Sequence, residues 1–180
     1  MKKRLEVIIC GFGGQGVIFA GVLLGRAGMR AGLETSQSAS YGSEARGSAC
    51  HAGVVLSPEQ IGYPNVKQPD VLIAMSQAGY DKFVETVKPG GMIYFDCHLI
   101  KMKEIENIEQ IGVPATSVAT QLGNKNVANV LILTAAVFGS KIIPEKALKT
   151  AVEEQSPSAF TEVNIKAFEQ GLKIGKMSSI

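Results

Sequence analysis

The chain has 180 residues, of which 46% are hydrophobic, and its formal net charge is +2. This length suits one domain with its own hydrophobic core, so we interpret residues 1–180 as a single domain. A charge so close to zero, with both signs mixed along the chain, gives no electrostatic reason to expect a nucleic-acid partner or an acidic membrane surface.

The first elements follow directly from the pattern of apolar residues. Residues 5–10 (LEVIIC) form a continuous apolar run, which is typical of a strand covered on both faces. Residues 17–31 predict a helix that is apolar nearly all round. Glycines recur along one side of this helix, which we expect to pack closely against the sheet or another subunit; they are Gly21, Gly25, Gly28 and Gly32.

A glycine-rich turn, GFGGQG at residues 11–16, joins this strand to this helix. It fits the dinucleotide-binding pattern G-x-G-x-x-G at Gly11, Gly13 and Gly16. Such a turn can present backbone amides and a helix N-terminus to a phosphate, and Glu34 could then bind a ribose, as in a stand-alone NAD(P)-dependent enzyme. A purely structural turn fits the pattern equally well. Gln15 places an amide in the turn, where it could bind a ligand or a neighbouring loop.

A second loop rich in glycine and serine spans residues 38–49, after a predicted strand at 33–38. We expect it at the carboxyl edge of the sheet, beside the glycine turn, where open α/β sheets bind ligands and partners. Arg46 could clamp a phosphate or carboxylate there, or it could instead pair with Glu44 in a solvated loop.

Strand and helix patterns alternate along the rest of the chain. Further strands are predicted at 50–56, 70–75 and 92–96, with a short last strand at 113–115 in an otherwise ambiguous segment, 97–115. Helices are predicted at 78–87, 124–139, 144–154 and 158–174. This alternation predicts an α/β fold: a single, Rossmann-like three-layer α/β/α domain with a mainly parallel sheet. We expect Asn124, Asn126 and Asn129 to cap and begin their helix.

The cysteines and histidines indicate no metal site and no catalytic residue. Cys10, Cys50 and Cys97 lie far apart and form no Cys-x-x-Cys pair, so a disulfide framework, a zinc site or an iron–sulfur cluster built by this chain alone is not expected. The two histidines, His51 and His98, lack partners at metal-ligand spacing. Free cysteines suit a reducing compartment, so we expect a cytoplasmic protein. The longest apolar stretch, residues 127–139, is shorter than the roughly 20 residues of a membrane span.

Several longer motifs together resemble the gamma subunit, or gamma domain, of 2-oxoacid:ferredoxin oxidoreductases, most closely the 2-oxoglutarate enzymes. The resemblance covers essentially the whole chain, and its most specific part is the pairing of GGQG with YGxEARG. The matching segments are GFGGQGVIFAG, SYGSEARGS, PDVLIAMSQAGYDKF, KPGGMIYFD, NVANVLILTAAVFG and EVNIKAFEQGLKIG.

The resemblance implies an enzyme that oxidatively decarboxylates a 2-oxoacid, forms an acyl-coenzyme A and reduces ferredoxin. Thiamine diphosphate, magnesium and [4Fe-4S] clusters would belong to partner subunits (alpha, beta and a ferredoxin-like delta), and the isolated chain would be inactive. This chain would help to enclose the coenzyme A side of the active site. Separately from the resemblance, the glycine-lined helix leaves open whether the isolated chain homodimerises. The implied contact residues are Gly11, Gly13, Gly14, Gln15 and Gly16 in the first loop and Tyr41, Gly42, Glu44, Arg46 and Gly47 in the second.

Overall fold

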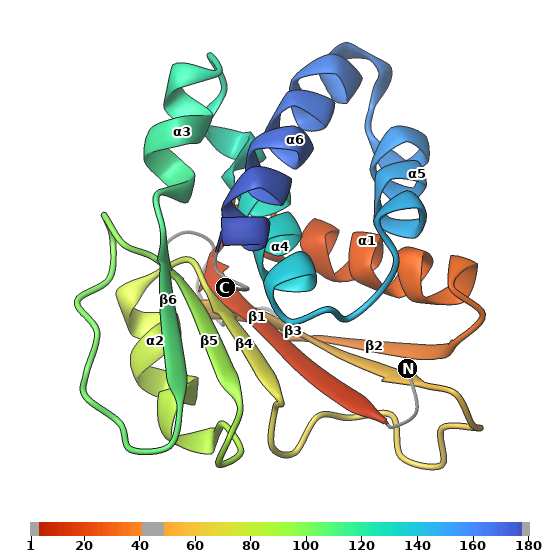
Figure 1. The fold of residues 1–180 in the computed structure, drawn as a ribbon, viewed down its shortest axis with the longest axis vertical. Helices are drawn as coiled ribbons and strands as arrows, with labels where there is room; N and C mark the ends of the chain where they lie inside the picture. Colours follow the sequence, from red (N-terminus) through yellow and green to blue (C-terminus); the bar gives the residue numbers. More distant parts are fainter. Residues whose placement is uncertain (1–3, 41–48, 178–180) are drawn as a thin grey trace.

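A six-stranded sheet forms the centre of the computed structural model, which describes residues 4–40 and 49–177 (Figure 1). The strands lie in the order β2–β3–β1–β4–β5–β6. β1 pairs in parallel with β4, β4 with β5 and β5 with β6, whereas β3 is antiparallel to both β1 and β2. Among the described strands β3 alone therefore runs against the other five, which confirms a mainly parallel sheet. The strands span Leu5–Phe12 (β1), Glu34–Ser40 (β2), Ala49–Ser57 (β3), Val71–Ala74 (β4), Met92–Asp96 (β5) and Glu109–Val113 (β6).

Helices cover both faces of this sheet, so the predicted three-layer α/β/α arrangement is confirmed (Figure 1). Alternate residues of β1 show the two cores: Val7 and Ile9 join the core beneath α1 and α4, whereas Ile8 and Cys10 join the core beneath α2. α5 and α6 pack outside α1 and α4. The helices span Val17–Arg30 (α1), Gln77–Phe83 (α2), Ala115–Gln121 (α3), Ala128–Gly139 (α4), Glu145–Gln155 (α5) and Thr161–Met177 (α6).

The structure corrects the prediction in the segment around Pro114. The last strand is Glu109–Val113, not residues 113–115, because Pro114 stands at the N-cap of α3. The short helix α3 was not predicted, since ATSVATQ carries neither an acidic first turn nor a side-chain cap. A 3₁₀ turn at Lys125–Val127 precedes α4, which begins at Ala128 rather than at residue 124.

The glycine side of α1 packs against this chain's own sheet. A Cβ atom on Gly21 would lie 2.9 Å from the Cβ of Ala52, and one on Gly28 would lie 2.7 Å from the Cγ2 of Thr35. The glycines thus let α1 approach β2 and β3 closely. Gly25 differs, because a Cβ atom there would meet no atom within 4 Å. At Gly21 and Gly28, the glycine side of α1 is therefore covered by the sheet and is not available there to a second copy of the chain.

Candidate functional site

The carboxyl ends of β1 and β4 create a crevice at the centre of the sheet edge. These two strands are parallel neighbours, with Cys10 opposite Ala74. The chain leaves β1 through α1 toward β2 on one side, and it leaves β4 through α2 toward β5 on the other. The connections that follow these two parallel strands therefore lead to opposite sides of the sheet. Such a point opens a crevice in which α/β proteins commonly bind ligands.

The glycine turn forms one wall of this crevice. Gly14 and Gly16 have φ angles of 94° and 71°, in the left-handed region that glycine adopts without strain, and Gly16 is the N-cap of α1. Gly11 is still within β1, where a Cβ atom would lie 2.6 Å from the Oε1 of Gln15. The tight turn and close packing expected of the pattern are therefore present.

The side-chain amide of Gln15 fastens the turn to the neighbouring strand. Its Oε1 accepts a hydrogen bond from the backbone N–H of Phe12 (2.7 Å), and its Nε2 donates to the carbonyl of Met75 (2.8 Å), just after β4. Of the two expected partners, a ligand or a neighbouring loop, the structure shows the second. Gln15 therefore has a structural role in holding the edge of the crevice.

A second amide, that of Asn129, fixes the other end of the turn. Asn129 is buried in the first turn of α4, and its Nδ2 donates to the carbonyl of Gly16 at 3.1 Å. Its Oδ1 accepts from the backbone N–H of Val130 at 2.7 Å. The capping role expected for Asn124 is confirmed by its bond from the N–H of Asn126, whereas the tie between Asn129 and Gly16 was not predicted.

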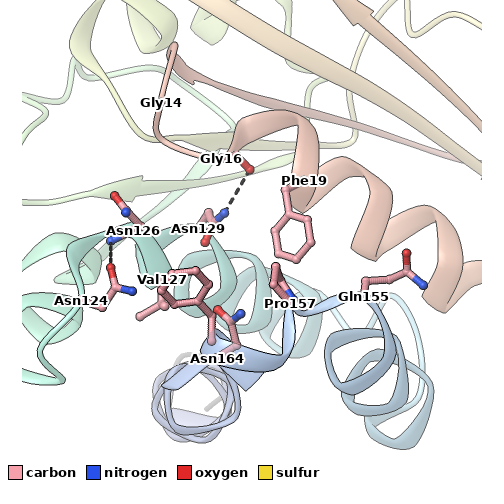
Figure 2. Close-up of a pocket in the computed structure, with 11 residues that line it drawn as sticks. Gly14, Gly16, Phe19, Asn124, Asn126, Val127, Asn129, Gln155, Pro157 and Asn164 are labelled. Atoms are coloured by element: carbon pink, nitrogen blue, oxygen red, sulfur yellow. Dashed lines mark hydrogen bonds between the residues drawn. The ribbon is translucent and has the colours of Figure 1, made fainter. Parts of the chain in front are cut away.

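Two cavities of about 440 Å³ each flank the turn, and both are lined in part by Gly14 and Asn126. The first lies between the start of α1, the start of α4 and the turn from α5 to α6, and Figure 2 shows its side-chain amides beside the ring of Phe19. It is lined by Gly14, Gly16, Phe19, Asn124, Asn126, Val127, Asn129, Gln155, Pro157, Phe160 and Asn164. These side chains are apolar or neutral amides, so the first cavity suits an uncharged group with hydrogen-bonding edges.

The second cavity opens at the β1–β4 crevice itself and carries a positive charge. It is lined by Gly13, Gly14, Gln15, Met75, Leu99, Thr116, Lys125, Asn126 and Ala128. Lys125 supplies the ammonium group and is exposed. The two cavities together form what we call the carboxyl-edge groove: a neutral part beside a part that can attract an anion.

A buried carboxylate holds the far wall of this groove. Asp96, at the end of β5, is 1% exposed. Its Oδ1 accepts from the N–H of His98 at 3.1 Å, and its Oδ2 accepts from both the N–H (2.8 Å) and the hydroxyl of Thr116. Because Leu99 and Thr116 line the second cavity, Asp96 positions two separate segments of the groove.

The structure does not bring Glu34 to the glycine turn. Glu34 begins β2 and pairs with Ser57 at the amino edge of the sheet, the edge opposite the turn. The seven residues of β2 span about 20 Å, and β3 separates β2 from β1. A carboxylate there cannot reach a ribose of a dinucleotide whose phosphates lie on the turn, so the geometry does not favour the NAD(P)-binding hypothesis.

The second loop can be placed only through its flanks. Tyr41, Gly42, Glu44, Arg46 and Gly47 lie outside the residues that the structure describes. Ala49 pairs with Phe12, and Ser40 ends β2, which runs in the same direction as β1. Both flanks therefore lie at the carboxyl edge, which agrees with the position expected for this loop.

None of the three thiols is activated as a nucleophile. Burial, together with Cys50, raises the pKa of Cys10 to about 12, and burial also raises the pKa of Cys50. The pKa of the exposed Cys97 is raised by partial burial and by Asp96. Residues 4–40 and 49–177 contain no group of three or more His, Cys, Asp or Glu side chains that could hold a metal ion. In the same ranges no helix is long and apolar enough to cross a membrane.

Comparison with known proteins identifies relatives along nearly the whole chain. Residues 6–174 match the family model described as pyruvate ferredoxin/flavodoxin oxidoreductase. The chain is 37% identical over 181 residues to the 2-oxoglutarate synthase subunit KorC of Methanocaldococcus jannaschii, covering 98% of this chain and 96% of that protein.

Solved structures agree with this similarity. The gamma subunit of a keto/oxoacid ferredoxin oxidoreductase from Geobacter sulfurreducens PCA superposes with a TM-score of 0.85 and 32% identity, covering 96% of this chain and 99% of the other. A 2-oxoglutarate:ferredoxin oxidoreductase from Magnetococcus marinus, solved with 2-oxoglutarate, coenzyme A and succinyl-CoA bound, has a TM-score of 0.87 at 23% identity. The match covers 98% of this chain and 32% of that one, and at this identity it shows a shared fold.

Proposed function

Since the chain belongs to the pyruvate ferredoxin/flavodoxin oxidoreductase family, we propose that it is the gamma subunit of a multi-subunit 2-oxoglutarate:ferredoxin oxidoreductase. The assembled enzyme oxidatively decarboxylates the 2-oxoacid, transfers the acyl group to coenzyme A and reduces ferredoxin. The observation that carries this proposal is the match to KorC, which extends over 98% of this chain and 96% of that subunit. On this view residues 1–180 form one gamma domain and work in the cytoplasm, where the three unpaired cysteines stay reduced.

We assign the redox and carbon chemistry to the partner subunits, alpha, beta and a ferredoxin-like delta. Three cysteines cannot supply the four thiolates of an iron–sulfur cluster, so such clusters belong to other chains. Thiamine diphosphate and magnesium belong there as well. This chain then contributes binding and enclosure: closing an active site against water protects a reactive intermediate from side reactions.

The carboxyl-edge groove is the part of this chain that we place against coenzyme A and a catalytic subunit. Its neutral cavity offers amides and the ring of Phe19 to an uncharged part of a ligand, and Lys125 offers a cation to an anionic part. Coenzyme A combines these two characters, because it carries amide groups and an adenine as well as phosphates. The glycine turn (residues 11–16) forms the shared wall, and the loop that contains Arg46 emerges from the same edge.

Steady-state kinetics of the reconstituted complex test this assignment. We expect Lys125→Gln to raise the KM for coenzyme A about fivefold to tenfold, because the lost charge contributes roughly 1 kcal/mol of binding free energy. The KM for 2-oxoglutarate should stay unchanged. Lys149→Gln is the matched control, since Lys149 is also exposed but lies on α5. Equal KM values for coenzyme A in both variants would contradict the proposal that the groove binds coenzyme A.

Assembly is tested separately with the two glycine-rich loops. Gln15→Ala and Arg46→Ala should each weaken either co-purification with the larger subunits or coenzyme A-dependent ferredoxin reduction. A tagged chain that brings no thiamine diphosphate-containing partner from its host would contradict the subunit role. Micromolar binding of NAD or NADP by the purified chain would instead favour a stand-alone oxidoreductase.

A further inference from the structure

A separate cavity of about 350 Å³ lies on the opposite face of the sheet from α1. Its floor is formed by β1, β3 and β2, and its walls by the end of α2 with the following turn and by the connection that leads into β4. It shares no lining residue with the two cavities of the carboxyl-edge groove. The side chains used below are Ile8, Ser38, His51, Val66, Lys67 and Phe83.

Gly53 lies in the floor of this cavity, between Ser38 and Val66. A Cβ atom at this position would lie 3.0 Å from the Oγ of Ser38 and 3.1 Å from the Cγ2 of Val66. Any larger residue would therefore push the hydroxyl or the opposite wall away. The absence of a side chain at Gly53 therefore lets Ser38 and Val66 approach the floor, and the backbone of Gly53 itself lines the cavity.

Hydrogen-bond donors and one cation converge on this space. The ring of His51 packs against that of Phe83, with centroids 4.8 Å apart, which orients the imidazole. Burial and the nearby Lys82 lower the pKa of His51, so near pH 7 the imidazole is neutral and has one N–H to donate. Ser38 offers a hydroxyl. Among the described residues that line the cavity, Lys67 carries the one ammonium group, which lies 4.6 Å from the ring centroid of Tyr63.

The remaining wall is apolar and determines which kind of anion fits. Ile8, Val66 and Phe83 present carbon atoms to the cavity. Inorganic phosphate has no carbon atoms to bury against them, whereas a short aliphatic acid has. We propose that this cavity binds a small organic carboxylate, with its oxygens toward His51, Ser38 and Lys67 and its aliphatic part against Ile8, Val66 and Phe83.

The two histidines of the chain provide a local reporter and an internal control. His51 lies in the cavity, whereas His98 lies at the carboxyl edge. In a titration of the full 180-residue chain with succinate, followed by proton NMR at constant ionic strength, we expect saturable shifts of the His51 ring signals. The signals of His98 should not move. Equal shifts of both histidines, or shifts that do not saturate, would overturn the proposal.

Two variants and a second anion complete the test. Lys67→Gln should weaken succinate binding at least fivefold and Ser38→Ala at least twofold, whereas Lys149→Gln, exposed on α5, should bind like the wild type. Inorganic phosphate should shift the His51 signals less than succinate does. Wild-type affinity of Lys67→Gln for succinate would contradict the proposal that Lys67 binds the carboxylate. An equal response of His51 to phosphate would contradict the proposal that the ligand is an organic carboxylate. Both results would leave the proposed gamma-subunit function unaffected, because that function rests on other residues.

Discussion

The side-chain amide of Asn129 donates a hydrogen bond to the carbonyl of Gly16 across a separation of 113 residues in the sequence. The bond joins the start of α4 to the N-cap of α1, and Asn129 is only 4% exposed. It therefore ties the glycine turn to the helix that passes between the sheet and α6.

Removal of this tie should destabilise the protein. Asn129→Ala removes both hydrogen bonds of the amide: the carbonyl of Gly16 loses a donor, and the buried N–H of Val130 loses its acceptor. We therefore expect the free energy of unfolding to fall by about 1–3 kcal/mol. Urea denaturation followed by circular dichroism measures this change. Asn126→Ala is the control, because Asn126 is exposed; a loss as large as that of Asn129→Ala would show that the two hydrogen bonds of the Asn129 amide are not the cause.

The two oxygens of Asp96 make a second prediction possible. Each oxygen accepts from a backbone N–H, one from His98 and one from Thr116, so an amide nitrogen in either position would face another donor. Asp96→Asn should therefore lower the free energy of unfolding by about 1–3 kcal/mol and loosen the start of α3. Thermal unfolding measures the loss. Asp81→Asn, which affects an exposed pair with Lys103 and an exposed hydrogen bond from Gln77, should leave the midpoint nearly unchanged.

Two glycines of the same helix should respond to alanine with opposite signs. Gly21→Ala places a Cβ atom 2.9 Å from that of Ala52, and this overpacking should cost about 1–3 kcal/mol. Gly25→Ala places it in open space, so the better helix propensity of alanine should stabilise the protein by about 0.5–1 kcal/mol. Denaturation midpoints of the two variants decide the matter. Two changes of the same sign would show that α1 does not contact β3 as described.

Thiol chemistry should separate the exposed cysteine from the buried pair. The pKa of Cys10 is raised to about 12, so at pH 8 its thiolate fraction is negligible and its side chain is shielded from reagents. Cys50 is also buried, whereas Cys97 is exposed. A disulfide reagent should therefore modify one thiol in the native chain and three in denaturant. Cys97→Ser should abolish the native reaction; a remaining fast thiol would show that the core around Cys10 opens.

Much of the fold could be predicted because its signals are local. The apolar run before the glycine turn and the helix after it are confirmed within two residues by Leu5–Phe12 and Val17–Arg30. Strand β5 is confirmed at the predicted bounds, Met92–Asp96. Helix α3 could not be predicted, since its start depends on Asp96, twenty residues earlier in the chain, rather than on a cap of its own.

The glycine turn likewise has one part that the local sequence predicts and another that depends on residues far away in the chain. Its pattern predicted a tight loop between a strand and a helix, and longer motifs indicated the family. The NAD(P)-binding hypothesis could be judged only from the position of Glu34, which depends on the insertion of β3 between β1 and β2.

The sequence by itself determined five of the six described strands, most of the helices and the family, because side-chain periodicity and motif spacing act over a few residues. Only the tertiary structure decided that Gln15 binds Met75, that Asn129 binds Gly16 and that Glu34 lies at the far edge. The physical reason is that a hydrogen bond requires its two atoms to lie about 3 Å apart, and strand order and direction decide which distant residues meet.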